Sequence, residues 1–323
     1  MSVEVGTPPT RVRRPGSRGR AFRRGLVVFA FLSPWVIGFV WFYLYPMLAS
    51  LYYSFTRYDG ILATPRWAGL FNYQFMFAHD PLFWQALRNT VWIVVVGTPL
   101  QILFAIGVAV VLTMPKRGRG VYRTIYFLPT MVPTVAAALS FLFLLNPAGP
   151  IDAVLRFLHL PTPLWFQDPH WSKPGLVLLG IWVVGQLMII FLAAILDVPQ
   201  QLYEAADIEG GRAWQKFRYI TLPMISPVIF FSTVISVIYG FQYFTEAYVI
   251  GAGAGSSGAA ISLGYPQGST LFYTIWLYQQ GFESFHLGYA SAMSWVLFLI
   301  VMACTIVVIK SSNRWVFYQG GFR

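Results

Sequence analysis

The chain has 323 residues, of which 57% are hydrophobic and only 10% are charged. Because a soluble domain usually carries about 25% charged residues, this composition excludes an ordinary cytosolic enzyme and indicates a chain solvated mainly by lipid. The formal net charge of +11 would favour a nucleic-acid partner in a soluble protein, but in a membrane protein the location of the cations matters more. The single cysteine, Cys304, excludes an intrachain disulfide.

Six apolar segments are long enough to cross a hydrocarbon core, which takes about 20 helical residues. They lie at residues 26–49, 89–114, 124–145, 176–196, 225–250 and 287–309. The first is not a cleavable signal peptide, because its apolar stretch is too long and no small-residue cleavage site follows it. We therefore predict an all-α integral membrane protein with six transmembrane helices.

The predicted organisation follows from these spans. We expect a disordered basic cytoplasmic tail at 1–25, a first transmembrane helix at 26–55, an external loop at 56–88, a core of five transmembrane helices at 89–310 with a cytoplasmic loop at 197–223, and a cytoplasmic tail at 311–323.

The distribution of cations predicts the orientation. If both termini lie on one side of the membrane, the opposite side holds only five of the 22 Lys and Arg residues, namely Arg57, Arg66, Arg88, Arg156 and Lys173. The positive-inside rule then places both termini in the cytoplasm. The external connections, at about 51–88, 146–175 and 251–286, are rich in Pro, Trp and Tyr, as interfacial loops tend to be.

The Arg-rich segment 11–24 precedes the first span and is interleaved with Pro, Gly and Ser. This pattern is typical of a disordered topology anchor, which can also contact anionic lipid. Nucleic-acid binding is the alternative, and we do not favour it because no aromatic or folded module accompanies the charges.

The signals of enzyme chemistry are missing from the sequence. The four histidines are scattered through external connections without ligand spacing, so no metal site is predicted. No Walker A sequence occurs, so we expect this chain to bind no ATP or other cofactor itself. Gly253, Gly255 and Gly258 match a dinucleotide-binding pattern, but the match follows a membrane span instead of a strand. We read it as a flexible external loop and predict no catalytic residue.

The cytoplasmic connection between the fourth and fifth spans is the most informative stretch. Pro199 is suited to open a short helix, and Gly210 with Gly211 permits a left-handed break before a second helix. Pro223 is expected to stop that second helix. The residues that share one face of the first helix are mostly small and suit close docking, namely Leu202, Ala205, Ala206 and Glu209. A membrane-surface loop, whose Trp214 and Phe217 dip into the headgroups, is the alternative.

The spacing within this connection resembles the EAA loop of binding-protein-dependent ABC importers. Glu204-Ala205-Ala206 is followed after three residues by Gly210, then after nine by Ile220, and then by Leu222-Pro223. The resemblance implies a coupling helix that contacts an ATPase. The residues it assigns to ATPase coupling are Glu204, Ala205, Ala206, Asp207, Gly210, Ile220, Leu222 and Pro223.

Other parts of the chain resemble the sugar-type permeases of the same family, such as those for maltose and glycerophosphate. The similar stretches are 31–34, 45–46, 54–56, 67–73, 83–90, 126–129, 146–149 and 288–292. The basic tail and the Gly-rich tract 251–258 lie outside the resemblance.

The resemblance implies a type I importer permease, a transport subunit and not an enzyme. Its expected partners are a second homologous permease, a dimer of ABC ATPases that holds ATP and Mg, an external solute-binding protein, a sugar substrate and the lipid bilayer, with no nucleic acid. The expected location is the cell membrane of a prokaryote. In this mechanism ATP-driven closure of the ATPases moves the coupling helices together, and the spans rock between inward and outward access.

Polar residues inside the spans are candidates for the substrate path, because an uncompensated polar group in lipid is costly. The candidate residues are Trp182 and Gln186 of the fourth span with Ser236, Tyr239, Gly240 and Tyr243 of the fifth. Their hydroxyl, amide and ring groups suit a sugar. Helix-to-helix hydrogen bonding is an equally common use of such residues. The residues of the fifth span recur at steps of three or four and so form one stripe along the helix, which Glu246 continues. Glu246 could face either the path or the outer interface.

Two other functions remain as alternatives. One is an ABC importer permease for a non-sugar solute, because other importers also carry EAA loops. The other is a self-contained secondary transporter or channel, which would need charged relays near the membrane midplane; only Glu246 could serve as one.

Overall fold

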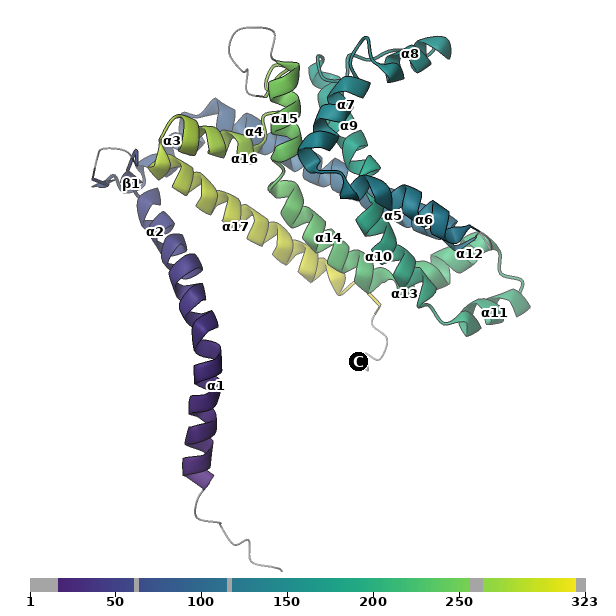
Figure 1. The fold of residues 1–323 in the computed structure, drawn as a ribbon, viewed down its shortest axis with the longest axis horizontal. Helices are drawn as coiled ribbons and strands as arrows, with labels where there is room; N and C mark the ends of the chain where they lie inside the picture. Colours follow the sequence, from purple (N-terminus) through teal and green to yellow (C-terminus); the bar gives the residue numbers. More distant parts are fainter. Residues whose placement is uncertain (1–16, 61–63, 115–117, 256–263, 318–323) are drawn as a thin grey trace, which may run out of the picture. The chain divides into compact units, whose positions relative to one another are not determined.

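The computed structural model describes residues 17–60, 64–114, 118–255 and 264–317, and they are mostly helical (Figure 1). The chain divides into two units, Met1–Tyr52 and Tyr53–Arg323. The first unit consists of α1 (Ser17–Phe39), the π-helical turn η1 (Val40–Leu44) and most of α2 (Tyr45–Ser54). Helix therefore begins at Ser17, so residues 17–25 of the tail that we expected to be disordered are helical, and residues 1–16 lie outside the described part.

The second unit contains two short strands and a set of helices. In chain order its elements are β1 (Thr56–Arg57), β2 (Arg66–Trp67), α3 (Phe71–Ala78), α4 (Pro81–Trp92), η2 (Ile93–Gly97), α5 (Thr98–Thr113), α6 (Arg119–Phe127), η3 (Leu128–Met131), α7 (Thr134–Leu144), α8 (Pro150–Phe157), α9 (Pro169–Trp182), α10 (Gly185–Leu196), α11 (Gln200–Ile208), α12 (Ala213–Lys216), η4 (Phe217–Thr221), α13 (Leu222–Met224), α14 (Ser226–Phe241), α15 (Thr245–Ala254), α16 (Tyr273–Tyr278), η5 (Gln279–Glu283) and α17 (Leu287–Ser312). The η3 turn is a 3-10 helix, whereas η2, η4 and η5 are π-helical.

Four of the helical segments are long and apolar enough to cross a membrane, and two bent pairs bring the number to six if each pair is one span. The four are Leu26–Ser54, Pro81–Thr113, Ser226–Ala254 and Leu287–Ser312, and the bent pairs are Gly120–Met131 with Thr134–Leu144 and Pro169–Trp182 with Gly185–Leu196. All six expected spans overlap these segments. The third and fourth expected spans correspond to the two bent pairs, which bend by 99° and 51°.

The third span breaks because Val132 precedes a proline. Its backbone is extended (φ −74°, ψ 129°), as residues before proline prefer, and α7 starts immediately after Pro133. The second span begins at Pro81, earlier than the expected residue 89, because the Asp80 carboxylate caps it. Oδ1 of Asp80 accepts hydrogen bonds from the backbone N–H groups of Leu82 (2.9 Å) and Phe83 (3.1 Å).

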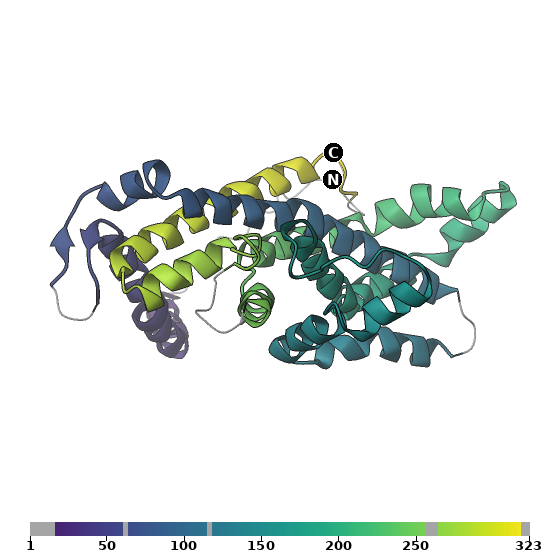
Figure 2. The ribbon, with the colours of Figure 1, turned by 90° about the horizontal axis from the view of Figure 1, so that it is seen from above.

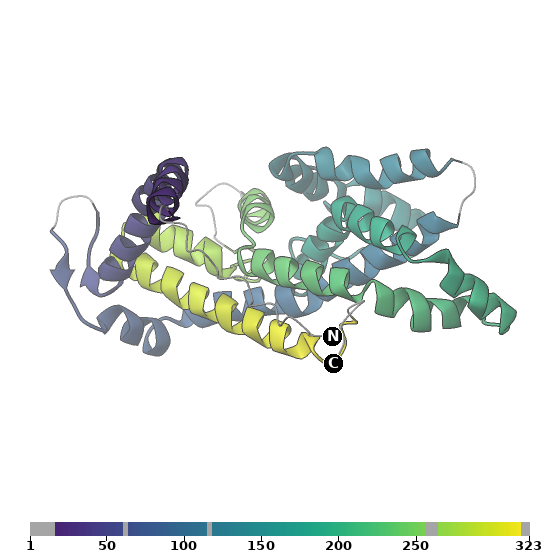
Figure 3. The ribbon, with the colours of Figure 1, turned by 90° about the horizontal axis from the view of Figure 1, so that it is seen from below.

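The helices of the second unit pack around three buried clusters. One joins α4, α7, α9, α14, α15 and α16, a second lies between α5 and α10, and a third joins α3, α4, α16 and α17. α17 runs beside α14 (Figures 2 and 3). The core therefore extends along the unit as a series of neighbouring helix contacts.

Within the connection between α15 and α17, residues 269–273 are buried, whereas residues 282–286 are exposed. Thr270, Phe272 and Tyr273 are fully buried. The side-chain amide of Asn89 on α4 donates to the carbonyl groups of Gly268 and Leu271, both at 2.8 Å. Residues 251–254 of the Gly-rich tract, which we expected to be a flexible loop, are helical, and residues 256–258 of the tract lie outside the described part.

We expect Asn89→Ala to destabilise this part of the fold, because the Leu271 carbonyl loses its side-chain donor and the Gly268 carbonyl keeps only the N–H of Leu271. A buried polar group that loses its partner costs about 1–3 kcal/mol. Gln85→Ala is the matched control, since Gln85 makes one exposed bond to the carbonyl of Gln267 on the same connection. The midpoint of thermal unfolding of the detergent-solubilised protein should fall for Asn89→Ala and change little for Gln85→Ala. Equal midpoints for the two variants would contradict a stabilising role of the Asn89 side chain.

Candidate functional site

Helix α11 carries the Glu-Ala-Ala sequence and projects from the helices around it. It begins after Pro199, whose backbone (φ −56°, ψ 125°) is suited to lead into a helix. None of its residues is buried, and it lies beyond α10 and α13 at one end of the second unit (Figure 1). Glu204 is exposed, and one of its carboxylate oxygens accepts a bond of 2.8 Å from the Gln200 side chain. The carboxylate is thus available to a basic group on another protein.

The break after α11 is left-handed, as the sequence predicts. Gly210 has φ +76°, and no other group lies within 4 Å of the position that a Cβ would occupy. The next residue, Gly211, donates to the carbonyl of Ala206 at 2.7 Å and closes the end of the helix. Glycine is therefore required at 210 by its backbone conformation and not by lack of space.

Side-chain contacts hold α11 against the second helix of the loop. Asp207 forms an ion pair with Lys216, and the Tyr203 hydroxyl lies 2.8 Å from the Thr221 hydroxyl. These contacts join the two helices on both sides of the break. The sequence singled out Asp207 but gave no role to Lys216, Tyr203 or Thr221.

Pro223 does not stop the second helix, contrary to our expectation. The π-helical turn η4 precedes it, in which the N–H of Leu222 bonds to the carbonyl of Phe217, and the helix continues to Met224. A π-helical turn displaces the carbonyl groups that would otherwise meet the proline ring and lack a donor. Leu222 and Pro223 therefore lie inside a helical run that leads into α14, as does Ile220 within η4.

The loop exposes apolar side chains that have no cover in the described chain. Ile208 is 89% exposed, and Trp214 and Tyr219 are 70% and 74% exposed. The predicted small face includes Ala205, which is exposed, and Ala206, which is half-buried beside a hollow of about 320 Å³. Sequence reasoning missed Ile208 and Tyr219, although both are large apolar residues within the motif. The arrangement presents exposed apolar side chains beside the acidic residues Glu204, Asp207 and Glu209.

Of the expected path residues, Trp182 and Gln186 flank the bend between α9 and α10. A Cβ at Gly185 would overlap the carbonyl of Tyr126, so α10 begins in direct backbone contact with the segment before the other bend. The breaks of the two bent pairs thus lie close together. Non-helical backbone at membrane depth is tolerated where it is covered by protein or lines a cavity. Trp182 also contacts Phe141 of α7, with ring centroids 5.4 Å apart.

The expected stripe along the fifth span is interrupted. α14 ends at Phe241 and α15 begins at Thr245, so Tyr243 lies in the break and Glu246 in the first turn of the next helix. Tyr243 and Glu246 therefore do not continue the helical face of α14 on which Ser236 and Tyr239 were expected to lie. Ser236 is half-buried and Tyr239 is 68% exposed.

Gly240 and Tyr243, two further residues of the expected path, have different surroundings. A Cβ at Gly240 would lie 3.0 Å from Val94 of η2, so this glycine serves close packing against the second span. The Tyr243 hydroxyl is buried and has no hydrogen-bond partner within the described ranges. A buried hydroxyl without a partner is unusual in a folded protein and marks Tyr243 as a residue that needs an explanation.

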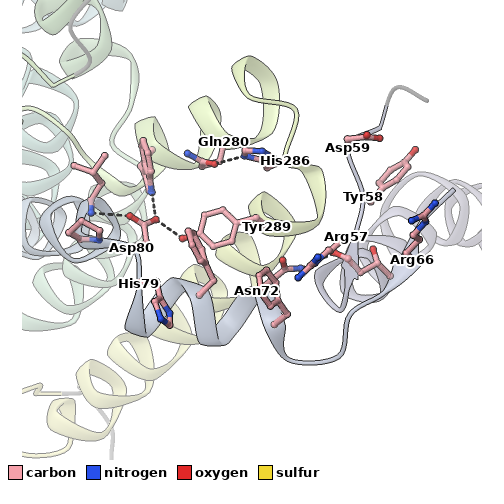
Figure 4. A pocket seen from close by; sticks show the side chains of 16 residues that line it. Arg57, Tyr58, Asp59, Arg66, Asn72, His79, Asp80, Gln280, His286 and Tyr289 are labelled. Carbon is pink, nitrogen blue, oxygen red and sulfur yellow. Dashed lines mark hydrogen bonds between the residues drawn. The ribbon is translucent and has the colours of Figure 1, made fainter. Parts of the chain in front are cut away.

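A second concave site, which the sequence did not reveal, lies at the other end of the unit from α11. We call it the α3–α17 chamber; it has a volume of about 860 Å³ (Figure 4). Its lining residues are Thr56, Arg57, Tyr58, Asp59, Arg66, Phe71, Asn72, Phe75, His79, Asp80, Pro81, Leu82, Trp276, Gln280, His286 and Tyr289.

Asp80 lies in the lining of this chamber and connects the helices around it. Its Oδ2 accepts bonds from Tyr289 Oη (2.5 Å) and Trp276 Nε1 (2.8 Å), while Oδ1 caps α4 (Figure 4). One buried carboxylate therefore joins α4, α16 and α17. The Asp80-Pro81 pair, a common way to begin a helix, is the sequence signal that could have located it.

Comparison with known proteins identifies the class. A family model described as "Binding-protein-dependent transport system inner membrane component" matches residues 101–316, more than half of the chain. The chain belongs to this family. It is an integral membrane permease component of an ABC transporter and not an enzyme.

Individual relatives cover nearly the whole chain. The probable ABC transporter permease protein YesP of Bacillus subtilis (strain 168) is 39% identical over 305 residues, which cover 94% of this chain and 96% of the relative. The lactose transport system permease protein LacF of Rhizobium radiobacter is 34% identical over 276 residues, which cover 84% and 89%.

A crystal structure of a bacterial ABC transporter involved in the import of the acidic polysaccharide alginate has the same fold. Its TM-score is 0.74 at 22% identity, and the match covers 92% of this chain and 99% of that one. The type I importer permease fold that the sequence predicts is thereby confirmed.

We expect Gly210→Ala to loosen the turn between α11 and α12, because a left-handed backbone costs an L-residue about 1–2 kcal/mol. That cost corresponds to roughly 5- to 30-fold faster amide hydrogen exchange around residues 209–212. Gly107→Ala, in the middle of α5 and also with open space at the Cβ position, is the control and should not increase exchange. Unchanged exchange in Gly210→Ala would show that the turn tolerates a side chain.

Proposed function

We propose that this chain is a membrane-spanning subunit of an ATP-driven importer for a sugar or sugar derivative. The observation that carries the proposal is the exposed α11 with its Glu-Ala-Ala sequence, within a chain that belongs to the importer permease family. Relatives named for lactose, arabinooligosaccharides and maltodextrin support the substrate class.

The importer would contain further subunits. We expect a second homologous permease, two ABC ATPases and an external solute-binding protein, with ATP and Mg held by the ATPases. The exposed apolar residues Ile208, Trp214 and Tyr219 support a protein partner at the loop, because such side chains are rarely left in water as a group. The excess of cations on the side of α11 and of both termini supports a cytoplasmic location for them, in the cell membrane of a prokaryote.

Transport would proceed by alternating access. ATP binding draws the ATPases together, and each pulls on the loop docked against it. Glu204 forms the charged contact, whereas Gly210 and the Asp207–Lys216 pair hold α11 at a fixed angle to the helix that leads into α14. The motion of the ATPase is thus passed to the spans through a rigid loop instead of a flexible one.

The substrate would cross next to the two bends. Trp182 offers a ring face and Gln186 an amide at the break between α9 and α10, and Tyr243 offers an unpaired hydroxyl at the break before α15. Ser236 and Tyr239 would add hydroxyl groups from α14. The packing of Gly240 against Val94 supports a structural and not a substrate-binding role for that residue.

The proposal is tested with the reconstituted importer. Radiolabelled lactose, arabinotriose and maltotriose are offered with the binding protein, and uptake and ATP hydrolysis are measured. We expect Glu204→Ala to lower both several-fold, because a charge-assisted contact of about 1.5–3 kcal/mol is lost. Asp197→Asn, which removes the same charge at the end of α10 and outside α11, is the control and should keep parental activity. Parental uptake and hydrolysis in Glu204→Ala would refute the coupling role, and ATP-independent uptake would refute the importer.

We expect Tyr243→Phe to slow uptake by about two- to tenfold, the effect of losing one hydrogen bond. Assembly and the binding protein's own sugar affinity should not change. Tyr248→Phe provides a matched control, since Tyr248 lies on α15 and its ring stacks on Phe244. Gln186→Ala should reduce uptake in the same range. If both substitutions leave uptake at the parental rate, these residues belong to the helix contacts and not to the path.

A further inference from the structure

The α3–α17 chamber is lined along α3 by a row of rings. Phe71, Phe75 and His79 recur every fourth residue, so they share one face of the helix. Phe71 and Phe75 have ring centroids 6.3 Å apart with planes 19° apart, and Phe75 and His79 have centroids 6.2 Å apart with planes 10° apart. The guanidinium of Arg57 lies 4.1 Å from the Phe71 ring and extends the row. The wall is thus a strip of nearly parallel flat groups.

The opposite wall carries hydrogen-bonding groups. Figure 4 shows Gln280 and His286 facing the α3 side across the chamber, with Tyr289 between them and Asp80. Gln280 Oε1 lies 3.0 Å from His286 Nδ1, which leaves the amide nitrogen of Gln280 and the second ring nitrogen of His286 for another partner. Asp80 uses its carboxylate to hold Trp276 and Tyr289, so it is a positioning residue and not a ligand-binding one.

The charges of the lining do not favour an ion. Arg57 and Arg66 are matched by Asp59 and Asp80, so the formal charges cancel. A phosphate or carboxylate ligand would find no excess of positive charge. Flat rings beside amide, imidazole and guanidinium groups instead suit a neutral polyhydroxylated ligand, whose ring faces stack and whose hydroxyl groups bond. A volume of about 860 Å³ lies within the range of ligand sites and admits more than one sugar ring.

The chamber lies where membrane spans begin. Pro81, the first residue of one span, is in its lining, and Leu287, the first residue of another, follows the lining residue His286. The helices α3 and α11 lie at opposite ends of the second unit (Figure 1). With α11 in the cytoplasm, the chamber opens on the external side. That is the side from which an importer receives its substrate.

We propose that the α3–α17 chamber is an external binding site for a neutral oligosaccharide, with the row of Phe71, Phe75 and His79 stacking on successive sugar rings. The proposal rests on the proposed function and adds a second sugar site to the path at the bends. Since stacking on a row of rings tolerates different sugars, the site binds several neutral oligosaccharides and prefers three rings to one.

The experiment measures sugar binding to the importer in lipid nanodiscs without its binding protein. Maltotriose, maltose and glucose are titrated and followed by saturation-transfer NMR. We expect maltotriose to bind most tightly and Phe75→Ala to weaken it by about three- to tenfold. Phe77→Ala is the matched control, because Phe77 lies on the same helix with similar exposure (47% against 41%) and packs on Phe83 and Trp84 outside the chamber. It should bind like the parent.

A second pair of variants separates stacking from folding. His79→Phe keeps the ring and should retain maltotriose binding, whereas His79→Ala should weaken it. No binding of maltotriose to the parent, or equal losses in Phe75→Ala and Phe77→Ala, would overturn the proposal. The proposal would also be overturned if sugars fail to bind and a phospholipid that co-purifies with the parent is lost only in Phe75→Ala. Uptake with the binding protein present is measured in parallel: intact uptake with no chamber binding refutes this site alone, and absent uptake refutes the proposed function.

Discussion

The structure depends on one constraint: inside a bilayer every backbone N–H and carbonyl group must find its partner within the protein. Proline breaks this rule wherever it enters a span, because it has no N–H and its ring displaces a carbonyl. The chain meets the problem in the same way three times, with a π-helical turn that ends two residues before the proline. The turns and prolines are Val40–Leu44 with Pro46, Ile93–Gly97 with Pro99, and Phe217–Thr221 with Pro223. Each of these helices continues past its proline, whereas Pro34 of α1 and Pro174 of α9 lie inside an α-helix without such a turn.

Where the chain does break at membrane depth, the breaks support one another. The extended residue Val132 ends one helix, and the bend after Trp182 ends another. Gly185 lets the backbone of α10 touch the segment around Tyr126, so the irregular backbone of one pair is covered by the other. Polar side chains placed at such a junction, Gln186 among them, are close to groups that cannot be left unsatisfied. This is the physical reason why a solute path and helix breaks occur together.

The sequence predicts the rough position of the spans because about 20 apolar residues are a strong signal over a short range. It also predicts the left-handed turn at Gly210, since only a local backbone property was needed. It does not predict that Pro223 lies inside a helix, because this depends on the π-helical turn at Phe217–Thr221, which changes the hydrogen-bond pattern before the proline. Asp80 was missed for another reason. Its partners Trp276 and Tyr289 are 196 and 209 residues away, and no local pattern reveals them.

The packing also connects the loop around α11 with the α3–α17 chamber at the other end of the second unit. α10 leads directly into the α11 loop and packs along α5, where Met188 and Phe191 are fully buried. α5 continues through η2 into α4, whose first turn is held by Asp80 at the wall of the α3–α17 chamber. A displacement of α11 therefore acts on a tightly packed interface and then on a continuous helix. Close-packed interfaces shift between discrete arrangements instead of deforming smoothly, so the two ends of the unit are set to change together.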